Sequence, residues 1–293
     1  MVVACTIGAS AGGIPHVGRD PSLFVASTVK EQHDQTPESH CHDGRARSAP
    51  TSGVSTQREK TIAHGQTPHA DNHIAVVIPT LNEKDFISKT IDSLLQHDIT
   101  EIVISDGGST DGTQDAVSAY DDVRLVESLP GRGRQINTGV ATVKSPIVVI
   151  LHADTQLPAA AVCQIKSALR DVSLSCGCFA LRFDDFAAPL RFYTWLSRYD
   201  SYWTTFGDQA FFFRRADFIS LGGAPEWPLF EDVELRRRFK TIGRFGKLQS
   251  SVVTSARRFK AKGPIRTQLF NAVMLVGYAM GIPPERLAAL YRR

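Results

Sequence analysis

Short apolar runs alternate with longer amphipathic stretches between residues 74 and 158. Four short runs predict strands, and the first of them, apolar and β-branched, predicts a buried strand: IAVVIP (74–79), EIVIS (101–105), VRLVES (123–128) and PIVVIL (146–151). The stretches between them favour helices: NEKDFISKTIDSLLQ (82–96), TQDAVSAY (113–120) and RQINTGVATVK (134–144). This alternation predicts an α/β fold with a doubly wound, mostly parallel sheet and helices on both of its faces.

The first predicted helix has both a start signal and an apolar face. Asn82 precedes it and is a candidate N-cap, because its side-chain oxygen can accept a bond from a free backbone N–H group. The residues expected on the buried face are Phe86, Ile87, Ile91, Leu94 and Leu95.

Residues 1–73 differ in character from the rest of the chain. They are rich in Ser, Thr, Gly, Pro and Gln, hold seven of the nine histidines, and show no apolar periodicity. We expect a disordered extension there, because such a segment cannot bury enough apolar surface to fold. The part from residue 159 to 293 is more irregular than the first half of the folded region.

Charge and cysteine content narrow the class of protein. The net charge of +3 is too small to indicate nucleic-acid binding. Five irregularly spaced cysteines indicate a reducing compartment. The chain has no apolar run long enough to span a bilayer and no secretory signal pattern at its start, so we expect a cytoplasmic protein.

Polar clusters follow three of the predicted strands. They are PTLNE at 79–83, DGGS at 106–109 and HAD at 152–154. In a parallel sheet such residues meet at one edge, where ligands bind. Asp106 and Asp154 would then approach each other, and two carboxylates repel unless a cation or donors separate them. Mg²⁺ or Mn²⁺, held by carboxylates and by substrate phosphates, fits this arrangement.

Glycines accompany two of these turns. DGGSTDGT (106–113) has three glycines in eight residues, which lets a ligand approach the backbone closely. GRGRQINTG (131–139) places Arg132 and Arg134 where a turn enters a helix. Helix starts favour phosphate, and arginines add charge-assisted donors, so this segment predicts a phosphate contact.

Taken in order, six motifs resemble those of the family 2 glycosyltransferases. They are VVIPTLNE, EIVISDGGSTDGT, GRGRQINTGVA, VVILHADTQLP, GDQAFFFRR and LFEDVELRRR. The resemblance covers residues 74 to 293 and is closest to a bacterial subgroup that carries LHADT where most members carry Asp-x-Asp. It implies the GT-A fold, with a nucleotide-binding half at 74–158 and an acceptor half with a basic C-terminal segment at 159–293.

The resemblance also implies the reaction and its partners. The expected activity transfers a sugar from a nucleotide diphosphate, with UDP the expected carrier, to a sugar or lipid acceptor, usually with inversion. The carried-over donor-binding residues are Pro79, Leu81, Asn82, Glu83, Asp106, Gly107, Gly108, Arg132 and Arg134. Asp154 matches the metal ligand. His152 stands where most relatives have Asp, and its role as nitrogen ligand, phosphate donor or supporting group stays open.

Asp232 matches the catalytic base of the family, with Glu231 as the second candidate. An inverting transfer needs a base that takes the proton of the acceptor hydroxyl. Asp208 and Gln209 in the GDQA segment are assigned to donor or acceptor binding, with a structural network as the alternative. The aromatic segment Trp195, Tyr199, Tyr202, Trp203 and Phe206 is interpreted as core packing or as a wall facing the acceptor.

Two further questions stay open at this point. Basic residues precede an apolar stretch near the C-terminus, which fits peripheral contact with the inner face of the membrane and fits equally a helix that closes the domain.

Two alternative functions are a nucleotidyltransferase and a non-catalytic sensor of nucleotide sugars. The PTLNE ending of the first strand argues against the former. The presence of both Asp154 and Asp232 argues against the latter.

Overall fold

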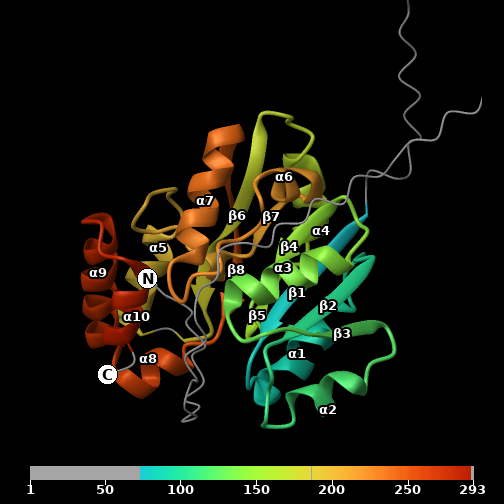
Figure 1. Cartoon of the computed structure of the whole chain (residues 1–293), viewed down its shortest axis with the longest axis horizontal. Helices are drawn as coiled ribbons and strands as arrows, with labels where there is room; N and C mark the ends of the chain where they lie inside the picture. Colours follow the sequence, from blue (N-terminus) through green and yellow to red (C-terminus); the bar gives the residue numbers. More distant parts are fainter. Residues whose placement is uncertain (1–72, 186, 292–293) are drawn as a thin grey trace, which may run out of the picture. The chain divides into compact units, whose positions relative to one another are not determined.

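The computed structural model describes residues 73–185 and 187–291, in which one mixed sheet of eight strands forms the centre (Figure 1). The strands are β1 (Ile74–Thr80), β2 (Glu101–Asp106), β3 (Val123–Glu127), β4 (Ile147–Ile150), β5 (Thr155–Gln156), β6 (Leu174–Phe183), β7 (Phe211–Arg214) and β8 (Arg244–Thr254). Their order across the sheet is β3-β2-β1-β4-β7-β6-β8-β5.

The described residues also form ten α-helices and one 3₁₀ turn, of which α8, α9 and α10 follow the last strand. The helices are α1 (Lys84–Leu94), α2 (Thr113–Ser118), α3 (Arg132–Thr142), α4 (Ala161–Ala168), α5 (Ala188–Leu196), α6 (Arg215–Ser220), α7 (Glu231–Ile242), α8 (Arg257–Lys262), α9 (Pro264–Ala279) and α10 (Pro284–Tyr291). The 3₁₀ turn η2 covers Gly207–Gln209.

The predicted α/β fold class is confirmed. β1 pairs in parallel with β2 and β4, and β2 pairs in parallel with β3. β7 runs antiparallel to β4 and β6, while β6 and β8 are parallel. The sheet is therefore mixed and mostly parallel.

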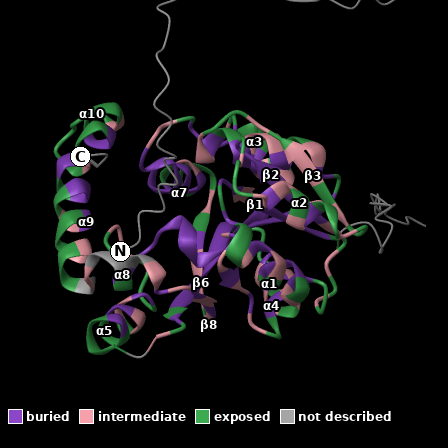
Figure 2. Ribbon diagram, turned by 90° about the horizontal axis from the view of Figure 1, so that it is seen from below, coloured by how far each residue is buried: buried purple, intermediate pink, exposed green. Residues whose placement is uncertain are grey.

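β1, β2 and β4 are buried along almost their whole length because helices cover both faces of the sheet. In β1, Ile74, Val76 and Ile78 face one core, whereas Ala75 and Val77 face the other. The first core includes side chains from α1, α2 and α4, and the second includes side chains from α3, α6 and α7. Figure 2 shows buried residues concentrated on the strands and on the inward faces of these helices.

The predicted start of the first helix is wrong by one residue. Glu83, not Asn82, is the N-cap, and its own side chain makes no capping bond. Asn82 instead adopts a left-handed backbone with φ of 56°. Ile87, Ile91 and Leu94 are buried as expected, but Leu95 is 44% exposed because the helix ends before it.

Helix α3 lies unusually close to the sheet at Gly139. A Cβ atom at this position would stand 2.3 Å from Cγ1 of Val77 in β1. Glycine is therefore required here by the close approach of helix and strand. This contact fixes the distance between α3 and the sheet, and with it the position of Arg132 at the start of α3.

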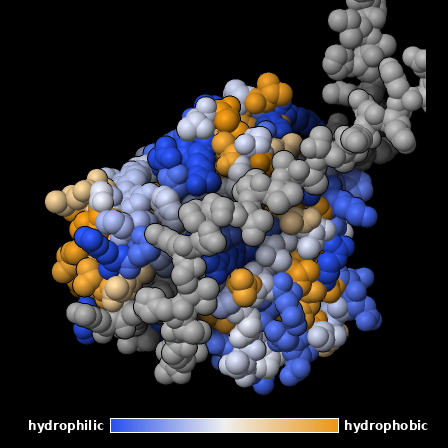
Figure 3. All heavy atoms as spheres, viewed as in Figure 1, coloured by the Kyte–Doolittle hydropathy of each residue, from blue (hydrophilic) through white to orange (hydrophobic). Residues whose placement is uncertain are grey.

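The C-terminal helices carry exposed apolar side chains. Along α9 and just past its end these are Ile265, Leu269, Phe270, Val273, Val276 and Met280. Five of them recur at helical spacing on one side of α9, and hydrophobic side chains gather over this helix in Figure 3. Among the described helices, none is both long and apolar enough to cross a membrane.

The aromatic segment before β7 divides between core and surface. Phe206 is buried, so its interpretation as a core residue is confirmed. For Trp195, Tyr199 and Trp203 that interpretation is wrong, because each is at least half exposed. The predicted disordered extension lies outside the described residues except for His73, so it stays a prediction.

Candidate active site

The chain returns to one edge of the sheet at four places. β1, β2 and β4 are parallel, so the segments that follow them leave the sheet at the same edge. β7 runs antiparallel to β4, and Ile150 lies opposite Phe211. The residues before Phe211 therefore lie at the edge where His152 and Asp154 follow β4. The fold thus brings the GDQ segment to the same edge as the HAD segment.

Asp106 holds together the loop that follows β2. It is fully buried, and its Oδ2 accepts bonds from the N–H groups of Gly108 (3.0 Å) and Ser109 (2.8 Å) and from Nε2 of Gln114 (2.7 Å). Three donors thus converge on one carboxylate oxygen. Asp106 therefore shapes the glycine loop. Its predicted contact with the donor stays a prediction.

The loops after β1 and β2 are tied together through Asn82. Its Oδ1 accepts a bond from the N–H of Thr110, and its own N–H donates to Oγ of Ser109, each at 2.8 Å. Next to it, Glu83 donates its N–H to Oγ1 of Thr113 at 2.9 Å. These bonds require the left-handed backbone at Asn82. Pro79 lies within β1, and Leu81 is buried just after it.

Asp154 lies against a cation that the sequence did not point out. The guanidinium of Arg257 contacts its Oδ2 at 3.4 Å and also pairs with Glu83. Weak bonds of 3.4 Å from the hydroxyls of Thr155 and Thr254 reach its Oδ1. Asp154 and Glu83, from the ends of β4 and β1, are therefore bridged by one arginine at the start of α8.

A divalent cation fits this carboxylate only with help from other ligands. In the described part of the chain, no group of three or more His, Cys, Asp or Glu side chains is arranged to hold a metal. Oδ2 of Asp154 does accept a positive charge, since Arg257 contacts it. Mg²⁺ commonly uses one or two carboxylates together with substrate phosphates, and Asp154 suits that mode. His152 is half-buried nearby, and its role stays open.

Glu231 and Asp232 form the first turn of α7. Oδ2 of Asp232 accepts the N–H of Gly207 at 2.7 Å, and Oδ1 accepts the N–H of Val233 at 2.8 Å. Glu231 pairs with Arg132 at 3.3 Å. Gly207 packs so tightly that a Cβ there would stand 2.7 Å from the guanidinium of Arg132. The starts of α3 and α7 and the turn η2 therefore meet at this point.

Asp208 is a second buried acid beside Asp232. It is 1% exposed, and neither carboxylate oxygen has a hydrogen-bond partner among the described residues. Burial, and then the charge of Asp232, raise its pKa to about 7. Burial, followed by the charge of Asp232, also raises the pKa of Glu231, although Arg132 opposes the shift. Asp208 and Glu231 are thus both protonated more readily than exposed acids, because they are buried beside Asp232.

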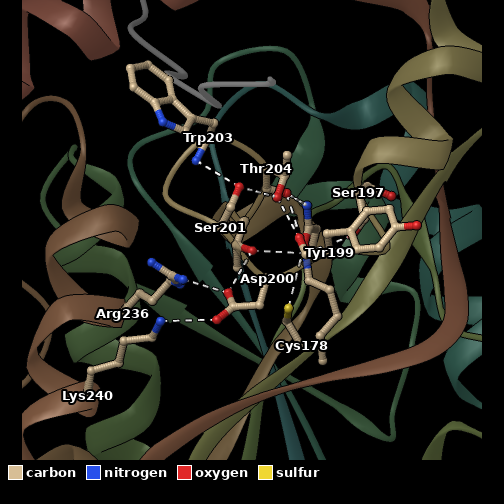
Figure 4. A network of polar contacts seen from close by, with 12 residues as sticks. Cys178, Ser197, Tyr199, Asp200, Ser201, Trp203, Thr204, Arg236 and Lys240 are labelled. Atoms are coloured by element: carbon tan, nitrogen blue, oxygen red, sulfur yellow. Dashed lines mark hydrogen bonds and ion pairs between the residues drawn. The ribbon is translucent and has the colours of Figure 1, made fainter.

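Gln209 belongs to a structural network and not to an open surface. It is fully buried, its Nε2 donates to the carbonyl of Thr204, and Sγ of Cys178 contacts its Oε1 at 3.5 Å. The wider network joins Asp200 to Arg236 (2.6 Å) and Lys240 (3.0 Å) (Figure 4). Burial alone would raise the pKa of Asp200, but these two cations lower it overall. The network fixes the aromatic segment against α7.

The predicted donor residues do not all lie together. Arg132 is buried beside the acids of α7, whereas Arg134 is half exposed and pairs with Glu226 at 2.9 Å. The assignment of both arginines to the diphosphate stays a prediction, better supported for Arg132, whose buried Nε has no hydrogen-bond partner among the described residues. Sequence reasoning missed Arg257 as a site residue. Its signal was a pair of arginines directly after β8.

Three residues other than glycine have a left-handed backbone, in the described part of the chain: Asn82, Ala210 and Phe230. Asn82 follows β1, Ala210 precedes β7, and Phe230 precedes Glu231. Each such conformation costs about 1–3 kcal/mol and persists only where its surroundings demand it. All three are at the loops that carry the candidate site, which supports a functional role for this edge of the sheet.

Comparisons with known proteins indicate a relationship to glycosyltransferases. A family model described as glycosyl transferase family 2 matches residues 75–220. The glucosyl-3-phosphoglycerate synthase of Mycolicibacterium paratuberculosis is 31% identical over 105 residues, which is 32% of this chain and 32% of that protein. The chain therefore matches about a third of the length of this curated relative.

Solved structures agree with this fold. The S. aureus protein TarS (residues 1–349) with UDP-GlcNAc superposes with a TM-score of 0.52 at 16% identity, over 62% of this chain and 58% of that one. The Mycobacterium tuberculosis glucosyl-3-phosphoglycerate synthase with Mn²⁺, UDP and glucosyl-3-phosphoglycerate gives 0.51 at 19% identity, over 73% and 82%. At these identities the likeness is one of fold.

Proposed function

Since the chain belongs to glycosyl transferase family 2, we propose that it transfers a sugar, with inversion, from a UDP-linked donor to the hydroxyl of a sugar or lipid acceptor. The observation that carries the proposal is the convergence at one sheet edge. The segments after β1, β2 and β4 and the segment before β7 meet there. They bring a glycine loop and several acids to the place where α/β sheets bind ligands.

Asp232 is the proposed base. Its two oxygens are oriented by backbone N–H groups from Gly207 and Val233, so its position does not depend on a flexible side chain. Fixing the base in this way lowers the cost of orienting it in the transition state. In an inverting transfer the carboxylate takes the acceptor proton as the hydroxyl attacks the anomeric carbon from the face opposite the diphosphate.

Arg132 is proposed to stabilise the leaving diphosphate. Its guanidinium is buried beside Glu231 and Gly207, and a buried cation next to developing negative charge acts more strongly than one in water. The proposed divalent cation is held by Asp154 together with the diphosphate oxygens. When bound, it neutralises charge on the leaving group.

The decisive experiment separates donor binding from transfer. We expect calorimetry to detect binding of UDP or a UDP-sugar in the presence of Mn²⁺. Asp232→Asn should keep this affinity within about twofold and lower turnover by roughly 10²–10⁴-fold, the usual contribution of a general base. Product analysis by NMR gives the anomeric configuration and so tests inversion.

A matched control is Asp98→Asn, because the side chain of Asp98 is 87% exposed and its contact with Lys166 at 3.1 Å lies on the surface. This variant should bind and turn over donor like the wild type. Turnover retained by Asp232→Asn would contradict the assignment of the base, and full activity of Glu231→Gln would exclude Glu231 as its substitute. If no nucleotide sugar binds, the proposed activity itself is wrong.

We also propose peripheral contact between α9 and an anionic lipid surface. Support comes from the exposed apolar stripe of α9, in which Leu269 is 67% and Val273 is 56% exposed. From residue 255 onward the chain has eight Lys or Arg residues and one acid, Glu285. An apolar face flanked by positive charge is the pattern of a helix that lies in the membrane interface.

A further inference from the structure

The carboxylates of Glu83 and Asp154 share one counter-charge. Both side chains are nearly buried, at 8% and 11% exposure, and Arg257 contacts both of them. A carboxylate removed from water is strongly destabilised unless a cation pairs with it. Arg257 therefore neutralises two acids that come from the ends of different strands.

Arg257 is also held by an aromatic ring. Its guanidinium lies 4.0 Å from the centroid of the Phe86 ring in α1. This cation–π contact fixes the guanidinium plane in front of the two carboxylates. The side chain nevertheless remains 30% exposed, so it can turn toward solvent or toward an arriving anion without opening the core.

We infer that Arg257 is the resident cation of the donor site and competes with the divalent cation for Asp154, an inference that rests on the proposed function above. A metal ligated by Oδ2 of Asp154 would stand about 2 Å from that oxygen. The guanidinium now lies 3.4 Å from the same atom. The two positive charges would then lie within about 5 Å of each other and repel, so each weakens the binding of the other to Asp154.

The donor supplies the second anion that makes this exchange favourable. When the diphosphate arrives, Arg257 can exchange a carboxylate for phosphate oxygens, which are equally good partners for a guanidinium. Asp154 is then open to the metal. Without nucleotide the arginine keeps Asp154, so Arg257 makes metal binding depend on the donor. Arg257 is thus a positioning residue that acts through Asp154.

The test measures binding of Mn²⁺ alone, without nucleotide, by electron paramagnetic resonance of the free ion. Arg257→Gln should tighten Mn²⁺ binding roughly tenfold or more, because it removes the competing positive charge from beside Asp154. Arg257→Lys, which keeps the charge, should stay closer to the wild type. The double variant Arg257→Gln with Asp154→Asn should lose the gain.

Arg286→Gln is the matched control, since Arg286 is exposed on α10, and it should bind Mn²⁺ like the wild type. Thermal melts establish that each variant is folded, and Arg257→Met replaces Arg257→Gln if the latter is not. Unchanged or weaker Mn²⁺ binding by the charge-removing variant overturns the inference. Because the probe is the metal alone, this result leaves donor binding untouched, whereas failure to bind any nucleotide sugar contradicts the proposed function instead.

Discussion

At the scale of single residues, the buried carboxyl of Asp208 is expected to make stability depend on pH. Its pKa is raised to about 7 in the fold, mainly by burial, against about 3.9 in an unfolded chain. The folded state therefore binds more protons than the unfolded state between these values. The contribution of Asp208 to the free energy of unfolding is therefore fully present below about pH 4, and it is lost as the pH rises through about 7.

Asp208→Asn should remove this dependence. As the pH rises from 4 to 8, the variant should become more stable relative to the wild type. A pKa shift of about three units corresponds to a change of up to about 4 kcal/mol in the difference between their free energies of unfolding. Urea unfolding at several pH values measures it, with the exposed Asp98→Asn as the control. A difference independent of pH would show that Asp208 is ionised in the fold.

The left-handed backbone at Ala210 leads to a second prediction. Its φ is 52°, a region where a Cβ atom costs energy and glycine does not. Ala210→Gly should raise the free energy of unfolding by about 0.5–1 kcal/mol. Ala289→Gly, in the exposed part of α10, should lower it by about 1 kcal/mol. Destabilisation by both substitutions would mean that Ala210 is not strained.

The acidic residues of the candidate site could be predicted from the sequence, whereas the residues that pair with them could not. Asp154, Glu231 and Asp232 sit in short motifs next to strand or helix ends, so their place at the sheet edge follows from local pattern. The link between Arg257 and Glu83 joins residues 174 positions apart. No local pattern specifies such a contact. The individual roles assigned to these residues remain predictions.

At the scale of secondary structure, the contact of α3 with β1 gives a direct prediction. Gly139→Ala should destabilise the protein by about 1–3 kcal/mol, because the added methyl group overlaps Val77. The double variant Gly139→Ala with Val77→Ala opens space for this methyl group and should recover part of the loss. Thermal melts measure both effects. If the single variant is as stable as the wild type, α3 can move away from the sheet.

The strands that consist of uninterrupted apolar runs could be predicted from the sequence. β1, β2 and β4 are buried on both faces and lack interruptions, so their sequences are strand-like throughout. β8 was missed because its run RFGKLQSSVVT mixes polar and apolar residues on a partly exposed strand. β5 has only two residues and is defined by its pairing with β8, which no local pattern reveals.

At the scale of the whole molecule, the exposed apolar side chains of α9 should determine whether the protein binds to a membrane surface. Vesicles that contain an anionic lipid such as phosphatidylglycerol should sediment with the wild-type chain. Leu269→Gln with Val273→Gln should weaken this binding by roughly tenfold or more, since each buried apolar side chain contributes about 1.5–3 kcal/mol. Higher salt should weaken it too.

The control for this experiment is Val172→Gln. Val172 is 89% exposed and lies between α4 and β6, away from α9 in the sequence, so the variant should sediment like the wild type. Equal vesicle binding by the α9 variant would contradict the proposed contact. Self-association of the wild type without vesicles, lost in the α9 variant, would instead identify the stripe as an interface between copies.

The stacked rings of Phe230 and Tyr278 connect α9, with its exposed apolar stripe, to the start of α7, where the proposed base lies. The rings are 4.8 Å apart and inclined by 27°. Phe230 directly precedes Glu231 and Asp232, and Tyr278 belongs to α9. A displacement of α9 would therefore act on a residue directly before the proposed base. Thermodynamic linkage makes such an effect reciprocal: if docking on lipid changes donor affinity by some factor, donor must change lipid affinity by the same factor.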